Sequence, residues 1–99
     1  MRGINIENFC ESLEHYAELE FEYNGKRYHI EPNDMDDEIC SLTVWTAEEN
    51  VENICIVKEI NTSKSGIAKE VINKVLNTKC FEGKSFFEIY NDIQIIDWG

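Results

Sequence analysis

The sequence predicts a single α+β domain, residues 1–99, with helices packed on a mainly antiparallel sheet of four to five strands. Three observations predict this class. An amphipathic helical pattern opens the chain, four strand-like segments with short connections follow, and two helical patterns precede a last strand. The 42% hydrophobic content is enough for one small core, and 99 residues leave no room for a second domain. The predicted order of elements is therefore α-β-β-β-β-α-α-β.

The first predicted element is a helix over residues 5–17. Asn5 is a good N-cap, and Glu7 lies in the first turn, where the helix dipole favours an acid. Apolar residues then recur at helical spacing from Ile6 to Ala17, while acidic residues fall on the opposite side. The pattern indicates a helix with one buried face.

A β-hairpin is predicted next, over residues 18–31. Apolar residues alternate with acidic ones before the dipeptide Asn24-Gly25, and the alternation resumes after it. Asn-Gly between two such runs favours a two-residue type I′ turn, which determines the register. Phe21 is then opposite Tyr28 on an apolar face, while the other face is rich in glutamate.

Two more strands are expected after the hairpin. Pro32-Asn33-Asp34 is predicted to break the second hairpin strand, because such residues are typical of turns. Alternation of apolar and polar residues predicts a third strand over 38–46. Residues 53–60 form a dense apolar run, so the fourth strand is predicted to lie in the centre of the sheet.

The C-terminal part predicts two helices and one strand. An apolar stripe predicts a helix over 65–78, and a shorter helix is expected over 85–91. Residues 93–98 form the last predicted strand. Its partner in the sheet, an edge strand or a central one, is left open by the sequence.

The tripeptide Gly83-Lys84-Ser85 is the ending of a phosphate-binding loop, which also needs a glycine at position 78. The chain has Thr78 there, so the backbone cannot wrap a phosphate in the usual way. Ser85 and Glu88 instead have the spacing of a capping box at the start of the short helix. This segment is therefore predicted to be architectural.

Two other patterns with possible chemistry lack required residues. The acidic run from Asp34 begins like a calcium-binding loop, but Ile39 and Trp45 occupy the required glycine and glutamate positions. Glu82 and Lys84 resemble the Glu-x-Lys of metal-dependent nucleases, but in a turn rather than a strand. Loose cation binding by the acidic run is an alternative. We expect no catalytic residue, no metal site and no cofactor.

The N-terminal sequence and the cysteine spacing predict a cytoplasmic protein. The start, MRGINIENF, lacks the apolar stretch of a signal peptide, and no apolar run approaches the ~20 residues of a membrane helix. The four cysteines are far apart in sequence and form no C-x-x-C pair, which favours free thiols. A secreted scaffold with two disulfides is the alternative.

The strongest global signal is a net charge of −11, which is distributed unevenly. Residues 1–38 hold eleven of the twenty acidic residues but three of the nine basic ones. Such a field repels nucleic acids and anionic membranes, and it attracts basic proteins. A role in solubility alone is the alternative explanation of the charge.

We therefore expect a non-enzymatic protein that binds a basic protein partner. The predicted contact residues are Glu18, Glu20, Glu22, Asp34, Asp36, Asp37 and Glu38. In size and charge, though in no motif, the chain is similar to immunity proteins of nuclease toxins and to phage inhibitors of restriction or CRISPR systems. The alternatives are a structural or regulatory homodimer joined through a sheet edge, and an enzyme.

Overall fold

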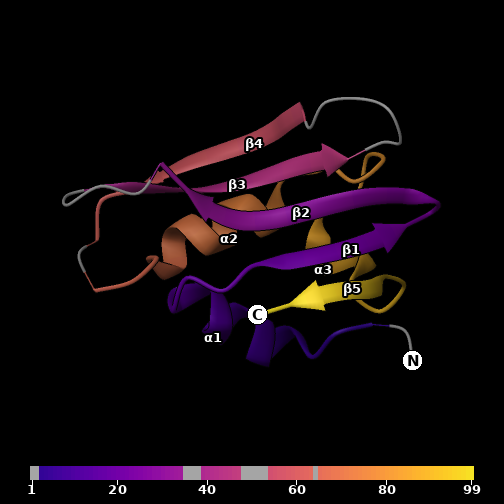
Figure 1. Cartoon of the computed structure of the whole chain (residues 1–99), viewed down its shortest axis with the longest axis horizontal. Helices are drawn as coiled ribbons and strands as arrows, with labels where there is room; N and C mark the ends of the chain where they lie inside the picture. The colour runs from indigo at the N-terminus through magenta and orange to yellow at the C-terminus, as the bar shows by residue number, and fades with distance from the viewer. Residues whose placement is uncertain (1–2, 35–38, 48–53, 64) are drawn as a thin grey trace.

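The computed structural model describes residues 3–34, 39–47, 54–63 and 65–99, and it confirms the predicted class and element order. Its elements are α1 (Ile6–Glu14), β1 (Leu19–Tyr23), β2 (Lys26–Asn33), β3 (Cys40–Ala47), β4 (Ile54–Asn61), α2 (Lys69–Asn77), α3 (Phe86–Ile89) and β5 (Gln94–Trp98). All strand pairs are antiparallel, in the order β4-β3-β2-β1-β5. The helices lie behind the sheet in Figure 1 and leave its front face uncovered.

The predicted hairpin is confirmed in turn type and register. Asn24 and Gly25 both have positive φ angles, 50° and 78°, as a type I′ turn requires. Phe21 pairs with Tyr28, and their rings stack with centroids 5.5 Å apart on the side of the sheet that faces the helices. The local sequence was sufficient here because a two-residue turn leaves only one register.

The prediction of a central fourth strand is wrong, because β4 lies at one edge of the sheet. Its apolar residues do not all enter the core. Val57 is buried, whereas Ile54, Ile56 and Ile60 are exposed. Hydrophobic density alone therefore could not place the strand, since only one of its sides faces the helices. The last strand, β5, takes the other edge and pairs with β1.

The predicted break at Pro32-Asn33-Asp34 is wrong for Pro32 and Asn33, and the strand ends only before Asp34. β2 continues to Asn33, and Pro32 pairs with Leu42 of β3. The β1 ladder stops at the pair of Leu19 with Ile30, so no described strand lies beside Pro32 on that side. A proline is tolerated at such a position because no neighbour there needs its missing N–H.

Both long helices are shorter than predicted because specific backbone features end or delay them. α1 stops at Glu14, and Tyr16 follows with a positive φ of 64°. α2 begins at Lys69 rather than 65, because the preceding loop is tied to other parts of the fold. The Asn61 side-chain amide donates to the Gly66 carbonyl at 3.0 Å, and its carbonyl accepts from the Ala68 N–H at 2.8 Å.

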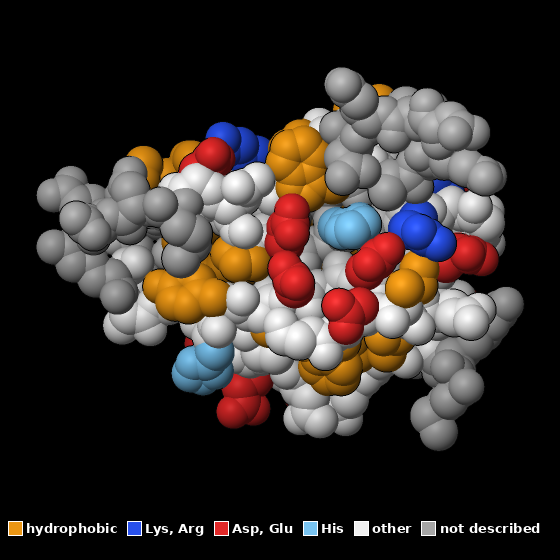
Figure 2. Space-filling view, in the orientation of Figure 1, with side chains coloured by type: hydrophobic (Ala, Val, Ile, Leu, Met, Phe, Trp, Pro, Cys, Tyr) orange, Lys and Arg blue, Asp and Glu red, His pale blue; other side chains and the backbone are white. Residues whose placement is uncertain are grey.

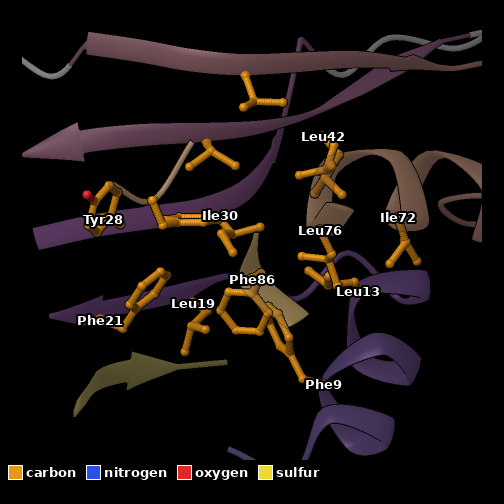
Figure 3. Packing of buried hydrophobic residues seen from close by; sticks show 14 of the residues in the cluster. Phe9, Leu13, Leu19, Phe21, Tyr28, Ile30, Leu42, Ile72, Leu76 and Phe86 are labelled. Atoms are coloured by element: carbon orange, nitrogen blue, oxygen red, sulfur yellow. The ribbon is translucent and has the colours of Figure 1, made fainter. Parts of the chain in front are cut away.

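The core lies between the sheet and the helices (Figure 3). Its centre is a cluster of fully buried aromatic rings. Phe86 of α3 lies 5.1 Å from Phe9 of α1 and 5.6 Å from Phe21 of β1, measured between ring centroids. Phe81 packs against Tyr28 at 5.0 Å. The cluster therefore joins α1, α3 and the hairpin.

The Gly83-Lys84-Ser85 segment has the predicted architectural role. Phe81 and Lys84 exchange two backbone hydrogen bonds, of 3.0 and 3.1 Å, around a two-residue turn. Ser85 is the N-cap of α3, and its N–H donates to the Glu88 carboxylate at 3.3 Å. The cap thus starts the short helix that carries Phe86 into the core.

Candidate partner-binding surface

The sheet face opposite the helices is the candidate surface, and we call it the open face. Side chains alternate between the two faces of the sheet along each strand, and residues that are paired across neighbouring strands lie on the same face. The outward residues are Glu20 and Glu22 of β1, Arg27, His29 and Glu31 of β2, Ser41, Thr43 and Trp45 of β3, Cys55, Lys58 and Ile60 of β4, and Gln94 and Asp97 of β5. The acidic residues are concentrated on β1, β2 and β5.

A shallow pocket of about 260 Å³ lies in the acidic half of the open face. Its lining residues are Glu18, Leu19, Glu20, His29, Glu31 and Asp97. Figure 2 shows acidic side chains grouped around a histidine in the middle of this face. We call Glu18, Glu20, Glu22, Glu31 and Asp97 the acidic surface. It brings residues from both ends of the chain together.

Among the described residues, Glu20 is the carboxylate of the acidic surface that forms ion pairs. Glu20 lies 3.6 Å from the Nε2 of His29, its predicted cross-strand partner. It also lies 3.7 Å from the Arg27 Nε, although Arg27 is paired with Glu22 in the register, so this second contact is diagonal. Within the described part of the chain, no ion pair involves the carboxylates of Glu18 or Glu22. The surface therefore keeps most of its negative charge available to a partner.

The structure separates Asp34 from the predicted contact residues of β1. Asp34 lies just after β2 and forms a salt bridge with Lys58 of β4, and its carboxylate also accepts a hydrogen bond from the Ser41 hydroxyl at 3.1 Å. The hydrogen bond from Lys58, and then that from Ser41, lower the pKa of Asp34. This exposed carboxylate therefore stays ionised, and Lys58 of the same chain compensates its charge. Asp36, Asp37 and Glu38 lie outside the described residues.

Two carboxylates of the acidic surface, Glu31 and Asp97, were not among the predicted contact residues. Glu31 was overlooked although it lies in the predicted hairpin and continues the alternation of Arg27 and His29. Asp97 was overlooked because the partner of the last strand was unknown. Its pairing with Glu20 places it on the same face.

Trp45 adds an aromatic side chain to the centre of the open face. It pairs with His29 across β2 and β3, beside the acidic surface. Its indole N–H donates to the Thr43 hydroxyl at 2.9 Å, which fixes the ring over the sheet. Tryptophan is one of the residues that contribute most to binding energy at protein interfaces. The signal for it in the sequence was the alternation of residues 40–46.

Within residues 3–34, 39–47, 54–63 and 65–99, no three His, Cys, Asp or Glu side chains are placed to hold a metal ion. Among the helices of these ranges, none has the length and apolar character to cross a membrane.

The four cysteines are free thiols with different environments, and their reactivities should differ. Burial raises the pKa of Cys80 to about 11, so at pH 8 only about one thiol in a thousand is ionised. Cys55 is exposed on the open face.

We expect a thiol-specific reagent at pH 8 to modify Cys55 first and Cys80 far more slowly, as measured by peptide mass spectrometry. A Cys55→Ser variant should lack the fast phase, and equal rates at Cys55 and Cys80 would contradict the assignment.

The surface has to be interpreted from its own residues, because the chain matches no family model, no curated protein and no solved structure.

Proposed function

We propose that this protein is a small, non-catalytic inhibitor or immunity-type protein that covers a basic, nucleic-acid-binding surface of a partner protein. Nuclease toxins and CRISPR or restriction effectors are proteins with such surfaces. The carboxylates would occupy the places of nucleic-acid phosphates. The partner would then be unable to bind its nucleic acid while the complex lasts.

The observation that supports this proposal best is the position of the acidic surface. Its carboxylates come from β1, β2 and β5 and lie on the face that the helices leave uncovered. A sheet face rich in carboxylates is complementary to a groove lined by lysine and arginine. A solubility role alone does not require the charges to gather on one side of the sheet.

The rigidity of the open face also supports binding. Central strands hold the carboxylates in fixed relative positions, so little conformational entropy is lost when a partner docks. Trp45 lies next to these carboxylates and has an apolar ring that a partner can cover. Protein interfaces commonly have an apolar centre, which contributes most of the affinity, and a charged rim, which contributes specificity.

Charge reversal on β1 tests the proposal. We expect Glu18→Lys with Glu22→Lys to slow association with the basic partner by about tenfold or more at low salt, because exposed charges steer encounter. The matched control is Glu11→Lys with Glu70→Lys, which changes net charge equally but on exposed sites of the helices α1 and α2. The control should change the rate by about twofold or less.

The partner can be obtained by passing native-cell extract over immobilised wild type and both double variants at about 100 mM salt. We expect wild type and the Glu11/Glu70 control to retain a basic protein that the Glu18/Glu22 variant loses. The purified partner should then release a fluorescently labelled oligonucleotide when wild type is added. Equal retention by all three proteins, or a ternary complex with the oligonucleotide, would rule the proposed mechanism out.

A further inference from the structure

We propose that Trp45 and Glu31 bind an arginine side chain of the basic partner, whose guanidinium stacks on the indole ring and pairs with the carboxylate. We call these two residues the arginine site. Both point outward on the open face, from the neighbouring strands β3 and β2. The inference rests on the proposed function, and it names the side chain that the partner would insert.

The indole ring of Trp45 is held in one position on the sheet. Its N–H donates to the Thr43 hydroxyl at 2.9 Å, and Thr43 lies two residues earlier on the same face of β3. The ring therefore extends along β3 from position 45 to position 43. Trp45 remains partly exposed, so a partner can reach the ring. A ring that is already fixed loses little conformational entropy when another group stacks on it.

Glu31 places a carboxylate beside this ring. Glu31 is paired with Thr43 across β2 and β3, and the Thr43 hydroxyl donates to the Glu31 carbonyl oxygen at 3.0 Å. Because the ring reaches Thr43, the Glu31 side chain projects from the adjacent strand next to the indole. No ion pair between described residues uses the Glu31 carboxylate. A guanidinium over the ring would therefore have a carboxylate within reach.

The charges on the two sides of the ring differ. On the side of β2 lies the acidic pocket, with Glu31 among its lining residues. On the side of β4 lies Lys58, whose ammonium forms a salt bridge with Asp34. Figure 2 shows hydrophobic and acidic side chains next to each other in the middle of this face. A cation on the ring is thus attracted towards β2.

Arginine suits this arrangement better than lysine does. A guanidinium is planar and weakly hydrated, so it can stack on an indole while donating two parallel hydrogen bonds to a carboxylate. An ammonium group is compact, strongly hydrated and has no flat face. A nucleic-acid base also stacks on tryptophan, but the carboxylates around Trp45 repel the phosphates that accompany it. Surfaces that bind nucleic acids commonly use arginine, which agrees with the class of partner proposed above.

Two peptides of equal charge test the arginine site, one of about eight arginines and one of about eight lysines, at about 100 mM salt. Calorimetric titration should give wild type a dissociation constant about three- to tenfold lower for the arginine peptide. Trp45→Leu should reduce this preference to about twofold or less. The matched control is Trp98→Leu, which removes an indole that is 38% exposed on β5 and should keep the preference. Thermal unfolding verifies that both variants are folded.

Glu31→Gln tests the carboxylate, with Glu22→Gln as its control. Each variant removes one negative charge from the open face, but Glu22 lies on β1, away from Trp45. Both should weaken binding of the lysine peptide by a similar factor, about twofold or less. Only Glu31→Gln should also reduce the preference for arginine, because only Glu31 adjoins the ring.

Trp98→Phe leaves Trp45 as the single tryptophan of the chain, so its fluorescence reports on the ring directly. The emission should change with the arginine peptide and stay constant with the lysine peptide at equal saturation.

Equal affinities of wild type for the two peptides, or a preference that survives Trp45→Leu, would overturn the arginine site. Binding of a single-stranded oligonucleotide that Trp45→Leu abolishes would overturn the choice of arginine as its occupant. The proposed function is tested separately, by retention of a basic protein on wild type and its loss on the Glu18/Glu22 variant.

Discussion

Gly66→Ala should destabilise the protein by about 4 kcal/mol or more, or prevent folding. A Cβ at this position would lie 2.3 Å from the Glu14 carbonyl oxygen, which is backbone and cannot move aside easily. The φ angle of Gly66 is +131°, a conformation that other residues rarely adopt. The Ile67 N–H also donates to the same Glu14 carbonyl at 3.1 Å, so the contact fixes the end of α1 against the β4–α2 loop.

Urea unfolding followed by circular dichroism measures this effect, and Gly83→Ala is the matched control. Gly83 also has a positive φ, of +82°, but no atom lies within 4 Å of the position its Cβ would take. Its alanine variant should lose only about 1–2 kcal/mol, the cost of the backbone conformation. Similar losses at the two glycines would show that the contact with α1 is unimportant.

Phe86→Ala should lower the free energy of unfolding by about 3–5 kcal/mol, the usual range for removing a buried aromatic ring. Phe86 is fully buried, and its ring contacts Phe9 of α1, Phe21 of β1 and Phe81 in the turn before α3. The cavity left by alanine would therefore remove packing contacts with three parts of the fold. Figure 3 shows Phe86 extending between Phe9 and Leu19.

The neighbouring Phe87 provides the control for Phe86, because it is only partly buried in the same short helix. Phe87→Ala should lower the free energy of unfolding by about 1–2 kcal/mol in the same urea experiment. Folding removes less of the apolar area of Phe87 from water, so less stability is lost with its ring. Equal losses for the two alanine variants would mean that the aromatic cluster does not centre on Phe86.

The acidic surface and the core lie in separate parts of the molecule. The acidic surface covers β1, β2 and β5, and the helices do not contribute to it, because they cover the other face of the sheet (Figure 1). A substitution in the core, such as Phe86→Ala, would therefore reduce partner binding through stability alone. Charge reversal should instead act on the surface itself.

The local parts of the fold were predictable because their determinants are neighbours in sequence. Asn24-Gly25 requires a type I′ turn, and alternation of apolar and charged residues assigns each hairpin residue to a face. Ser85 and Glu88 likewise start α3 through contacts three residues apart. From the hairpin register, the outward positions of Glu20 and Glu22 in the candidate site followed directly.

The remaining parts depend on contacts between distant segments, which no local pattern encodes. Residues 53–60 are apolar enough for a central strand, yet the helices cover only one side of β4 and the strand lies at an edge. Gly66 delays α2 because its backbone meets Glu14, 52 residues earlier in the chain. Local propensity cannot anticipate such contacts, since they form only when the whole core packs.

The sequence by itself determined the α+β class, the hairpin register and the large negative charge, because periodicity, turn chemistry and composition act locally or in sum. Only the tertiary structure decided that Asp97 joins the glutamates of the hairpin on one face. That arrangement depends on β5 pairing with β1. The pairing follows from how the core closes, which is a property of the chain as a whole.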